Sequence, residues 1–263
     1  MIFEFVSLTH PGLVRDNNED TVACDAKHGI AVLADGMGGY NAGEIASAMA
    51  AAFVRSELSQ WLSSAGQTAS SAQGVRQALG AAVSGANLSI YRAALSNPQF
   101  SGMGTTVVVG MFGAVRVMLA HVGDSRCYVW RKSRLTQLTH DHSLLQEQLD
   151  AGLISTEQAK IASHKNLVTR ALGVDERVDV DIVEHLPEID DLYLLCSDGL
   201  TDMVDDEDLV RILASSTGLS AKAEALIRSA NDAGGRDNIS VILVAAKAKS
   251  ASAGFFSRML GLS

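Results

Sequence analysis

Residues 105–130, TTVVVGMFGAVRVMLAHVGDSRCYVW, decide the fold class of this 263-residue chain. They contain three runs rich in β-branched and other apolar residues, separated by Gly113 and Ala114 and again by Gly123 and Asp124. Short apolar runs bounded by glycine are typical of buried strands. Because both breaks are short enough for hairpins, we expect neighbouring strands in this stretch to be antiparallel.

Two long segments upstream show helical periodicity. Apolar residues recur at intervals of three and four over 45–62 and over 75–90, and the small, polar stretch 63–74 is predicted to be the loop between them. Further elements are expected before and after these two helical segments. Strands are predicted at 2–9, 21–24, 29–34, 134–138, 178–184, 192–196 and 238–246, and short helices at 206–214 and 221–231.

The order of these elements predicts an α+β fold. Strands and helices do not alternate as they do in a parallel sheet, so we expect antiparallel sheets packed together with helix pairs outside. No repeat or linker divides the chain. Residues 140–176 are polar and irregular, with helix-start patterns at Ser143 and Ser155 and a helix stop at Gly152. They interrupt the strand pattern, either as an insertion over a site or as a simple surface excursion.

Composition excludes several classes of protein. The formal net charge is −9, which argues against nucleic-acid binding. The chain lacks a signal peptide pattern and any apolar run near the ~20 residues that span a bilayer. Its three cysteines, Cys24, Cys127 and Cys196, lie far apart and without CxxC spacing, so we expect reduced thiols in a cytoplasmic protein.

Acidic residues adjoin the predicted strands in five places. Each aspartate has glycine or asparagine within two residues. The segments are Asn18-Glu19-Asp20, Ala34-Asp35-Gly36, Gly123-Asp124-Ser125, Ser197-Asp198-Gly199 and Arg236-Asp237-Asn238. One such segment is most simply a turn. Five of them at the ends of core strands could converge, and converging carboxylates repel each other unless a cation joins them. Oxygen ligands alone suit Mg²⁺ or Mn²⁺.

The same residues resemble a known family. In order along the chain they are RDNNED (15–20), ADGMGG (34–39), GTT (104–106), GDSR (123–126), DHS (141–143), LLCSDGL (194–200) and GGRDNIS (234–240). This ordered set is similar to that of the PPM/PP2C protein phosphatases, and most of all to bacterial single-domain members. The resemblance implies a four-layer α-β-β-α sandwich over residues 1–247, a flap at 140–176, and a short tail at 248–263.

The resemblance also implies site residues. Asp35 would bridge two metal ions, Mn²⁺ or Mg²⁺, and the Gly36 carbonyl would bind one of them. The other expected roles are Asp198 and Asp237 as metal ligands, Glu19 and Asp20 as holders of metal-bound water, Asp124 with Asp198 at a third, weaker metal site, and Arg15 as a bidentate phosphate clamp. A hydroxide bridging the metals would then attack phosphorus without a phosphoenzyme.

One position departs from the family pattern. Some members carry a histidine within DGHGG that can act as general acid, and this chain has Met37 there. Methionine cannot donate a proton, so that role is vacant or filled by a metal-bound water. We assign no general acid, and we expect His121, His140 and His142 to be structural. Arg15 could alternatively pair with Asp16 or Glu19 on the surface.

The implied activity is hydrolysis of phosphoserine and phosphothreonine in substrates of a serine/threonine kinase, by a monomer that neither inserts into membranes nor binds nucleic acid. Three alternatives remain. Residues 29–43 resemble a glycine-rich nucleotide loop, but GxGxxG spacing is missing. A catalytically weak binding protein with the same fold, and a metallohydrolase of small phosphate esters, are the others. In the tail, Phe255, Phe256, Met259 and Leu260 could form a docking helix, although a disordered or self-packed tail is the more common outcome.

Overall fold

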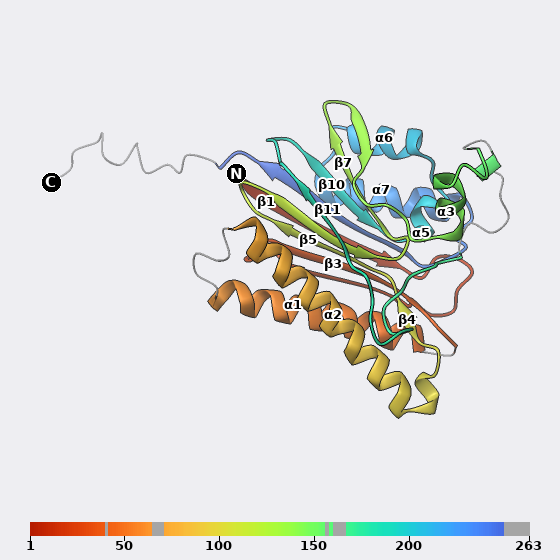
Figure 1. Ribbon diagram of the computed structural model, residues 1–263. Coiled ribbons are helices and arrows are strands. Elements are labelled where there is room, and N and C mark those ends of the chain that lie inside the picture. Colours follow the sequence, from red (N-terminus) through yellow and green to blue (C-terminus); the bar gives the residue numbers. More distant parts are fainter. Residues whose placement is uncertain (40–41, 65–70, 156–157, 160–166, 250–263) are drawn as a thin grey trace, which may run out of the picture.

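Two antiparallel β-sheets stacked face to face form the centre of the computed structural model, which describes residues 1–39, 42–64, 71–155, 158–159 and 167–249 (Figure 1). The first sheet has the strand order β1 (Ile2–His10), β11 (Ile239–Lys247), β10 (Leu192–Cys196), β7 (Arg126–Arg131) and β8 (Arg134–Gln137). The second has the order β2 (Asp20–Asp25), β3 (Ile30–Met37), β5 (Val107–Phe112), β6 (Val117–Val122) and β9 (Asp181–His185), with β4 (Gly104–Thr105) added to β3.

Helices cover the outer face of each sheet. The pair α1 (Ala42–Ser64) and α2 (Ala72–Ser96) packs on the second sheet, and α6 (Asp206–Ala214) and α7 (Leu219–Asp232) pack on the first (Figure 1). Buried apolar side chains fill three layers: between α1/α2 and the second sheet, between the two sheets, and between the first sheet and α6/α7. The predicted α+β, four-layer sandwich is confirmed.

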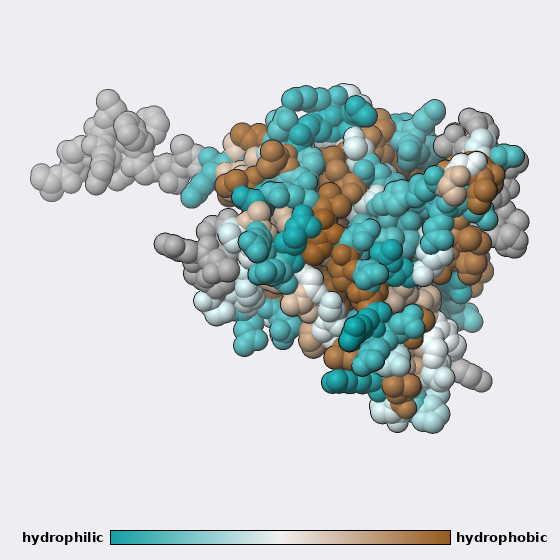
Figure 2. All heavy atoms as spheres, viewed as in Figure 1, coloured by the Kyte–Doolittle hydropathy of each residue, from teal (hydrophilic) through white to brown (hydrophobic). Residues whose placement is uncertain are grey.

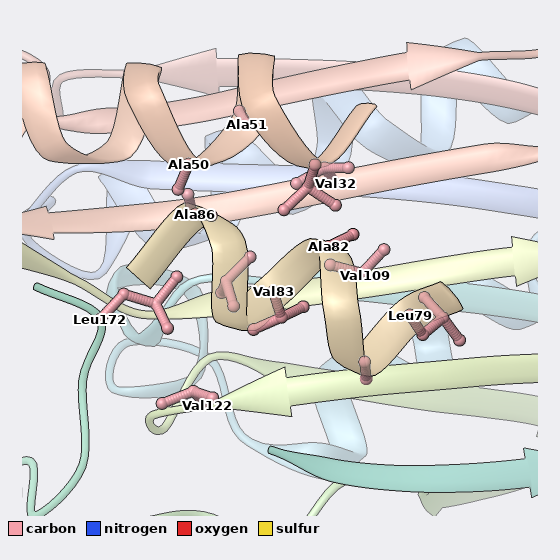
Figure 3. Packing of buried hydrophobic residues seen from close by; sticks show 14 of the residues in the cluster. Val32, Ala50, Ala51, Leu79, Ala82, Val83, Ala86, Val109, Val122 and Leu172 are labelled. Atoms are coloured by element: carbon pink, nitrogen blue, oxygen red, sulfur yellow. The ribbon is translucent and has the colours of Figure 1, made fainter. Parts of the chain in front are cut away.

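Small side chains allow α1 and α2 to lie close to the second sheet and to each other. Ala46, Ala50 and Ala86 are fully buried, and Figure 3 shows Ala50 of α1 facing Ala86 of α2 above the strands that carry Val32 and Val109. The larger residues Ile45, Met49 and Phe53, which carry the helical periodicity in the sequence, pack only partly buried at the margin of this layer. Close approach of backbones therefore depends on alanine rather than on the large apolar residues.

Aromatic rings join the two sheets at the end of the sandwich where the chain begins. The ring of Phe112 on β5 lies 5.5 Å from Phe3, 5.6 Å from Phe5 and 5.3 Å from Tyr193, measured between centroids. The three partners all belong to the first sheet. Tilted and edge-on ring pairs at this spacing are favourable beyond their burial.

Two predictions about connections are wrong. The break at Gly123 is not a hairpin: β6 lies in the second sheet and β7 in the first, so residues 123–125 carry the chain across the sandwich. The small, polar stretch 63–74 is also not all loop, because α1 continues to Ser64 and α2 begins at Ala72, with the Ser71 side chain accepting from the Gly74 N–H. Residues 65–70 lie outside the described part of the chain.

The predicted insertion begins with α3 (Leu144–Asp150). Ser143 caps this helix by accepting from the Gln146 N–H at 3.3 Å, and Gly152 ends it with a φ of +65°. At Ser155 and Gln158 each side chain accepts from the other's backbone N–H, as expected of a capping box. The continuation of that segment, and the tail positions Phe255, Phe256, Met259 and Leu260, lie outside the described residues.

Two short elements complete the structure, a 3₁₀ turn η2 (Pro98–Phe100) and α5 (Asp198–Thr201). Within the described ranges, none of the helices is long and apolar enough to cross a membrane. Figure 2 shows that hydrophilic residues dominate the viewed face and that hydrophobic ones form smaller patches among them. The three cysteines are free, and Cys127 and Cys196 are buried in the sandwich.

Candidate metal centre

Strand ends from both sheets bring the acidic segments together at one end of the sandwich, where β4, α3 and α5 gather (Figure 1). On the second sheet, Asp20 at the start of β2 lies directly opposite Asp35 near the end of β3. On the first sheet, β10 leads into Asp198, and Asp237 precedes β11. The two sheets thus present carboxylates toward the same space.

A cleft of about 460 Å³ occupies that space. Seven of the eight predicted site residues line it: Arg15, Glu19, Asp35, Gly36, Asp124, Asp198 and Asp237. The eighth, Asp20, lies behind the wall and is 7% exposed. Residues 200 positions apart in sequence therefore meet at one site.

Hydroxyl groups hold the Asp35 backbone in place. The Asp35 carbonyl accepts from the Thr106 N–H and from the Thr105 hydroxyl, both at 2.8 Å, and the Asp35 N–H donates to the Thr106 hydroxyl at 3.2 Å. Thr106 in turn pairs with the Ser125 hydroxyl at 2.8 Å. The GTT and GDSR motifs therefore fix the strand end from which the Asp35 carboxylate enters the cleft.

The carboxylate of Asp20 has one satisfied oxygen and one orphaned oxygen. Oδ2 accepts from the Ser197 hydroxyl at 2.8 Å, while the buried Oδ1 has no hydrogen-bond partner. Burial raises the pKa of Asp20 to about 6, and hydrogen bonds from serine hydroxyls offset part of that rise. An orphaned, buried carboxylate oxygen is costly, and its cost falls when a positive group reaches it.

The other carboxylates raise each other's pKa values. Burial is the main cause of the raised pKa of Asp35 and of Asp198, and the charges of the neighbouring aspartates add to it in both cases. The pKa of Asp124 is raised to about 6 by burial and by Asp141. Asp124 is also the neighbouring charge with the largest effect on Asp198, in keeping with the predicted pairing of these two residues.

This donor set fits divalent cations that prefer oxygen. Five aspartates share one small region, and all seven residues predicted to bind metal or metal-bound water there offer carboxylate or carbonyl oxygens. Bound cations would stabilise the charged carboxylates and bring their pKa values down again. The residues that would hold them are Asp35, Asp198, Asp237, Asp124 and the Gly36 carbonyl, with Glu19 in the wall of the cleft and Asp20 behind it.

Glycine at two positions is required by close backbone contacts. A Cβ atom on Gly36 would lie 2.2 Å from the Gly43 carbonyl oxygen, and one on Gly199 would lie 2.0 Å from the Asn238 carbonyl oxygen. The start of α1 therefore packs directly on Gly36 near the end of β3, and the residue before β11 packs on α5. Only glycine lets the two backbones approach this closely at either position.

Arg15 lies at the mouth of the cleft and is 55% exposed. Its guanidinium donates to Asp237 Oδ2 at 2.8 Å, so its ion-pair partner is neither Asp16 nor Glu19. Glu19 accepts instead from the Asn17 side-chain amide at 3.2 Å. The arginine that was predicted to clamp phosphate is thus in contact with a predicted metal ligand, which places the two functions side by side.

A second cluster that could hold a metal consists of His121, His142 and Asp181, whose ligand atoms all lie within 4.8 Å of one another. His142 Nδ1 accepts from the Gly123 N–H at 3.0 Å, so its single proton is on Nε2, where it donates to Asp181 at 3.1 Å. That nitrogen has no free lone pair for a metal. Arg170 also pairs with Asp181 at 3.3 Å. The cluster is a hydrogen-bonded link between the flap and the 123–125 crossing, consistent with structural histidines.

Several residues at the site were missed or left without a role. Thr105, Thr106, Ser125 and Ser197 belong to quoted motifs, but sequence periodicity assigns no partner to a hydroxyl. Asp202 raises the pKa of both Asp124 and Asp198. Its position four residues after Asp198 on α5 is the signal that could have found it, because residues four apart share a helix face. Met37 lines the cleft as expected.

Comparisons with known proteins agree with this geometry. Residues 12–237 match the protein phosphatase 2C family. The chain is 40% identical over 239 residues to the serine/threonine phosphatase stp of Listeria innocua, covering 90% of this chain and 93% of that protein. The structure resembles the crystal structure of the Mycobacterium tuberculosis serine/threonine phosphatase PstP/Ppp, with a TM-score of 0.84, 34% identity, and coverage of 94% of this chain and 100% of that one.

A further similar structure contains manganese. The catalytic domain of the serine/threonine protein phosphatase PstP in complex with two manganese ions is 34% identical to this chain, with a TM-score of 0.82, and the match covers 94% of this chain and 99% of that one. The fold, the motif residues gathered at one cleft and these similarities lead to one conclusion: the chain belongs to the protein phosphatase 2C family.

Proposed function

We propose that this protein is a metal-dependent serine/threonine protein phosphatase that hydrolyses phosphoserine and phosphothreonine. The observation that carries the proposal is the convergence of Asp20, Asp35, Asp124, Asp198 and Asp237 around one cleft with an arginine at its mouth. Mn²⁺ or Mg²⁺ is the proposed cofactor, as two ions with a third, weaker site at Asp124. The family membership and the manganese found in PstP support the choice of metal.

The chemistry follows from the charge distribution. When bound, a pair of divalent cations would activate the attacking water by lowering its pKa and would neutralise charge on the phosphoryl group. Asp35, Asp198 and Asp237 orient that pair from two sheets. The Arg15 guanidinium is half exposed beside Asp237, and a guanidinium can hold two phosphate oxygens. Neither Cys127 nor Cys196 is placed to act as a nucleophile, since both are buried in the sandwich and burial raises the pKa of both thiols; this excludes a cysteine phosphoenzyme, and the family resemblance implies none on another residue. We therefore infer direct attack by water without a phosphoenzyme.

The test is phosphate release from a phosphothreonine peptide in Mn²⁺ or Mg²⁺, in EDTA, and with Asp35→Asn and Asp198→Asn. We expect chelation to abolish turnover and each substitution to lower kcat by at least about 100-fold, the scale of losing one preorganised charge at a reacting centre. Glu57→Gln on the exposed face of α1 is the control and should retain activity. Activity that survives both EDTA and the two substitutions would overturn the proposal.

A parallel assay with an aryl phosphate separates the alternatives. A phosphatase of proteins should show the higher kcat/KM with the phosphopeptide, whereas a metallohydrolase of small esters should not. A weak binding protein would retain the metal and show negligible turnover with both. Substrates of a serine/threonine kinase, a monomeric state and a cytoplasmic location are further proposals that come from the family resemblance and the reduced cysteines.

A further inference from the structure

Residues 11–19 form a loop that carries Arg15 and Glu19 to the cleft and has no regular secondary structure. Its hydrogen bonds within the segment are few and local. The Glu19 side chain accepts from Asn17, and the Asn18 side chain accepts from the Asp20 N–H. Such a loop does not hold a long arginine at a fixed place by itself, because ordering each residue costs conformational entropy.

One side chain outside the loop makes three hydrogen bonds to it. Asn238, the residue before β11, is 6% exposed. Its amide nitrogen donates to the Pro11 carbonyl at 3.0 Å and to the Asn17 carbonyl at 2.9 Å. Its amide oxygen accepts from the Glu19 N–H at 2.7 Å. A single amide thus binds the loop at its beginning and at its end.

Two further contacts press the same loop against the residues next to Asn238. The Leu13 N–H donates to the Gly235 carbonyl at 2.7 Å. Gly12 has a φ of +80°, and a Cβ atom on it would lie 2.2 Å from the Asp237 carbonyl oxygen. The loop therefore lies directly on the chain that carries Asp237, to which Arg15 is ion-paired.

We propose that Asn238 is a positioning residue, which holds the 11–19 loop on the start of β11 so that Arg15 meets the phosphate beside Asp237. The inference rests on the proposed function of Arg15 as the phosphate clamp. Both amide hydrogens of Asn238 are used within the protein, so its nitrogen has none left for the substrate. Neither alanine nor aspartate can replace it, because both lack the two N–H donors.

The chain contains a matched control. Asn87 on α2 is 1% exposed, donates to the carbonyls of Asp175 and Glu176 at 3.0 and 3.1 Å, and accepts from the Gly173 N–H at 2.8 Å. Asn87→Ala therefore removes the same number and kind of hydrogen bonds from a different loop, one that does not carry Arg15. Any general effect of losing a buried amide should appear in both variants.

The first measurement is a double-mutant cycle on kcat/KM with Arg15→Ala, Asn238→Ala and the double variant. Asn238→Ala alone should lower kcat/KM by about 10- to 100-fold, as for other groups that orient a reacting residue. On the Arg15→Ala background it should lower kcat/KM by less than about threefold, because its effect passes through Arg15. Asn87→Ala should have the same effect with and without Arg15. Additive effects of Asn238 and Arg15 would overturn the inference.

The second measurement needs no activity. Amide hydrogen exchange in EDTA should become at least about tenfold faster at Leu13 in Asn238→Ala, as expected for losing several hydrogen bonds around the loop. The Leu13 N–H donates to Gly235 and not to Asn238, so it reports movement of the loop rather than loss of its own partner. Asn87→Ala should leave Leu13 unchanged. Unchanged exchange at Leu13 in Asn238→Ala would contradict the inference, whereas an inactive native enzyme would contradict the proposed function instead.

Discussion

Asp124 shows, at the scale of one residue, why the metal-free site lowers the stability of the folded protein at neutral pH. It is 7% exposed, and burial together with Asp141 raises its pKa to about 6. In an unfolded chain an aspartate has a pKa near 3.9. The folded state therefore binds the proton of Asp124 more tightly than the unfolded state does. The contribution of this group to the free energy of unfolding is fully present below about pH 4 and is lost as the pH rises through about 6.

Asp124→Asn should thus stabilise the metal-free protein at neutral pH. At pH 7.5 in EDTA we expect the free energy of unfolding to rise by on the order of 2 kcal/mol, since two pKa units correspond to nearly 3 kcal/mol before the cost of burying the new amide. At pH 4.5 the variant and the native protein should differ little. Urea denaturation at both pH values measures this. An equal gain in stability at both pH values would show that the charge of Asp124 is not its cause. The control variant Glu57→Gln should leave stability unchanged at both pH values.

Lys222 connects two elements, α6 and α7. Its ammonium group lies at the end of α6, where it donates to the carbonyl of Leu213 at 2.6 Å and to the carbonyl of Ser215. These carbonyls lack partners within the helix, and a cation at a helix C-terminus also interacts favourably with the helix dipole. Burial lowers the pKa of Lys222, so the carbonyls provide what the ammonium loses in hydration.

Lys222→Met keeps the length of the side chain and removes its charge. We expect the free energy of unfolding to fall by about 1–3 kcal/mol, because the last carbonyls of α6 become unsatisfied. Thermal and urea denaturation measure the loss, and phosphatase activity at low temperature should persist, since Lys222 lies outside the cleft. Lys27→Met, at an exposed turn position, is the control. Equal stability of Lys222→Met and the native protein would mean that water replaces the ammonium at no cost.

At the scale of the whole molecule, the two sheets share one apolar layer, and Phe112 belongs to it with three aromatic neighbours from the first sheet. Phe112→Ala should lower the free energy of unfolding by about 3–5 kcal/mol, the usual cost of deleting a buried aromatic ring. Val115→Ala, at a side chain that is 71% exposed, should cost less than about 0.5 kcal/mol.

The same variant tests whether the sandwich unfolds as a unit. Because Phe112 belongs to the second sheet and its partners to the first, circular dichroism and tryptophan fluorescence should shift together to lower urea concentration. Trp61 is on α1 and Trp130 is on β7, so the fluorescence reports both halves. Two separate transitions in Phe112→Ala would show that the sheets are independently stable.

Local pattern in the sequence was sufficient to predict most elements and the residues of the site. Periodicity located both long helices, apolar runs located the strands, and the acids beside those runs predicted a cluster that lines one cleft. Such features depend on neighbours within about a turn or a strand, which the sequence displays directly. The motifs around Asp35, Asp198 and Asp237 were sufficient for the family.

Pairing between distant segments was decided only by the tertiary structure. The run of residues 126–130 reads as a hairpin partner of the preceding strand, yet β7 pairs with β10 in the other sheet. Arg15 pairs with Asp237 rather than with an acid beside it, and one amide just before β11 binds the loop that carries it at two points. A sequence shows that a side chain is suited to burial or to hydrogen bonding. Which partner it meets depends on how the whole chain closes, because partners far apart in sequence leave no local signal.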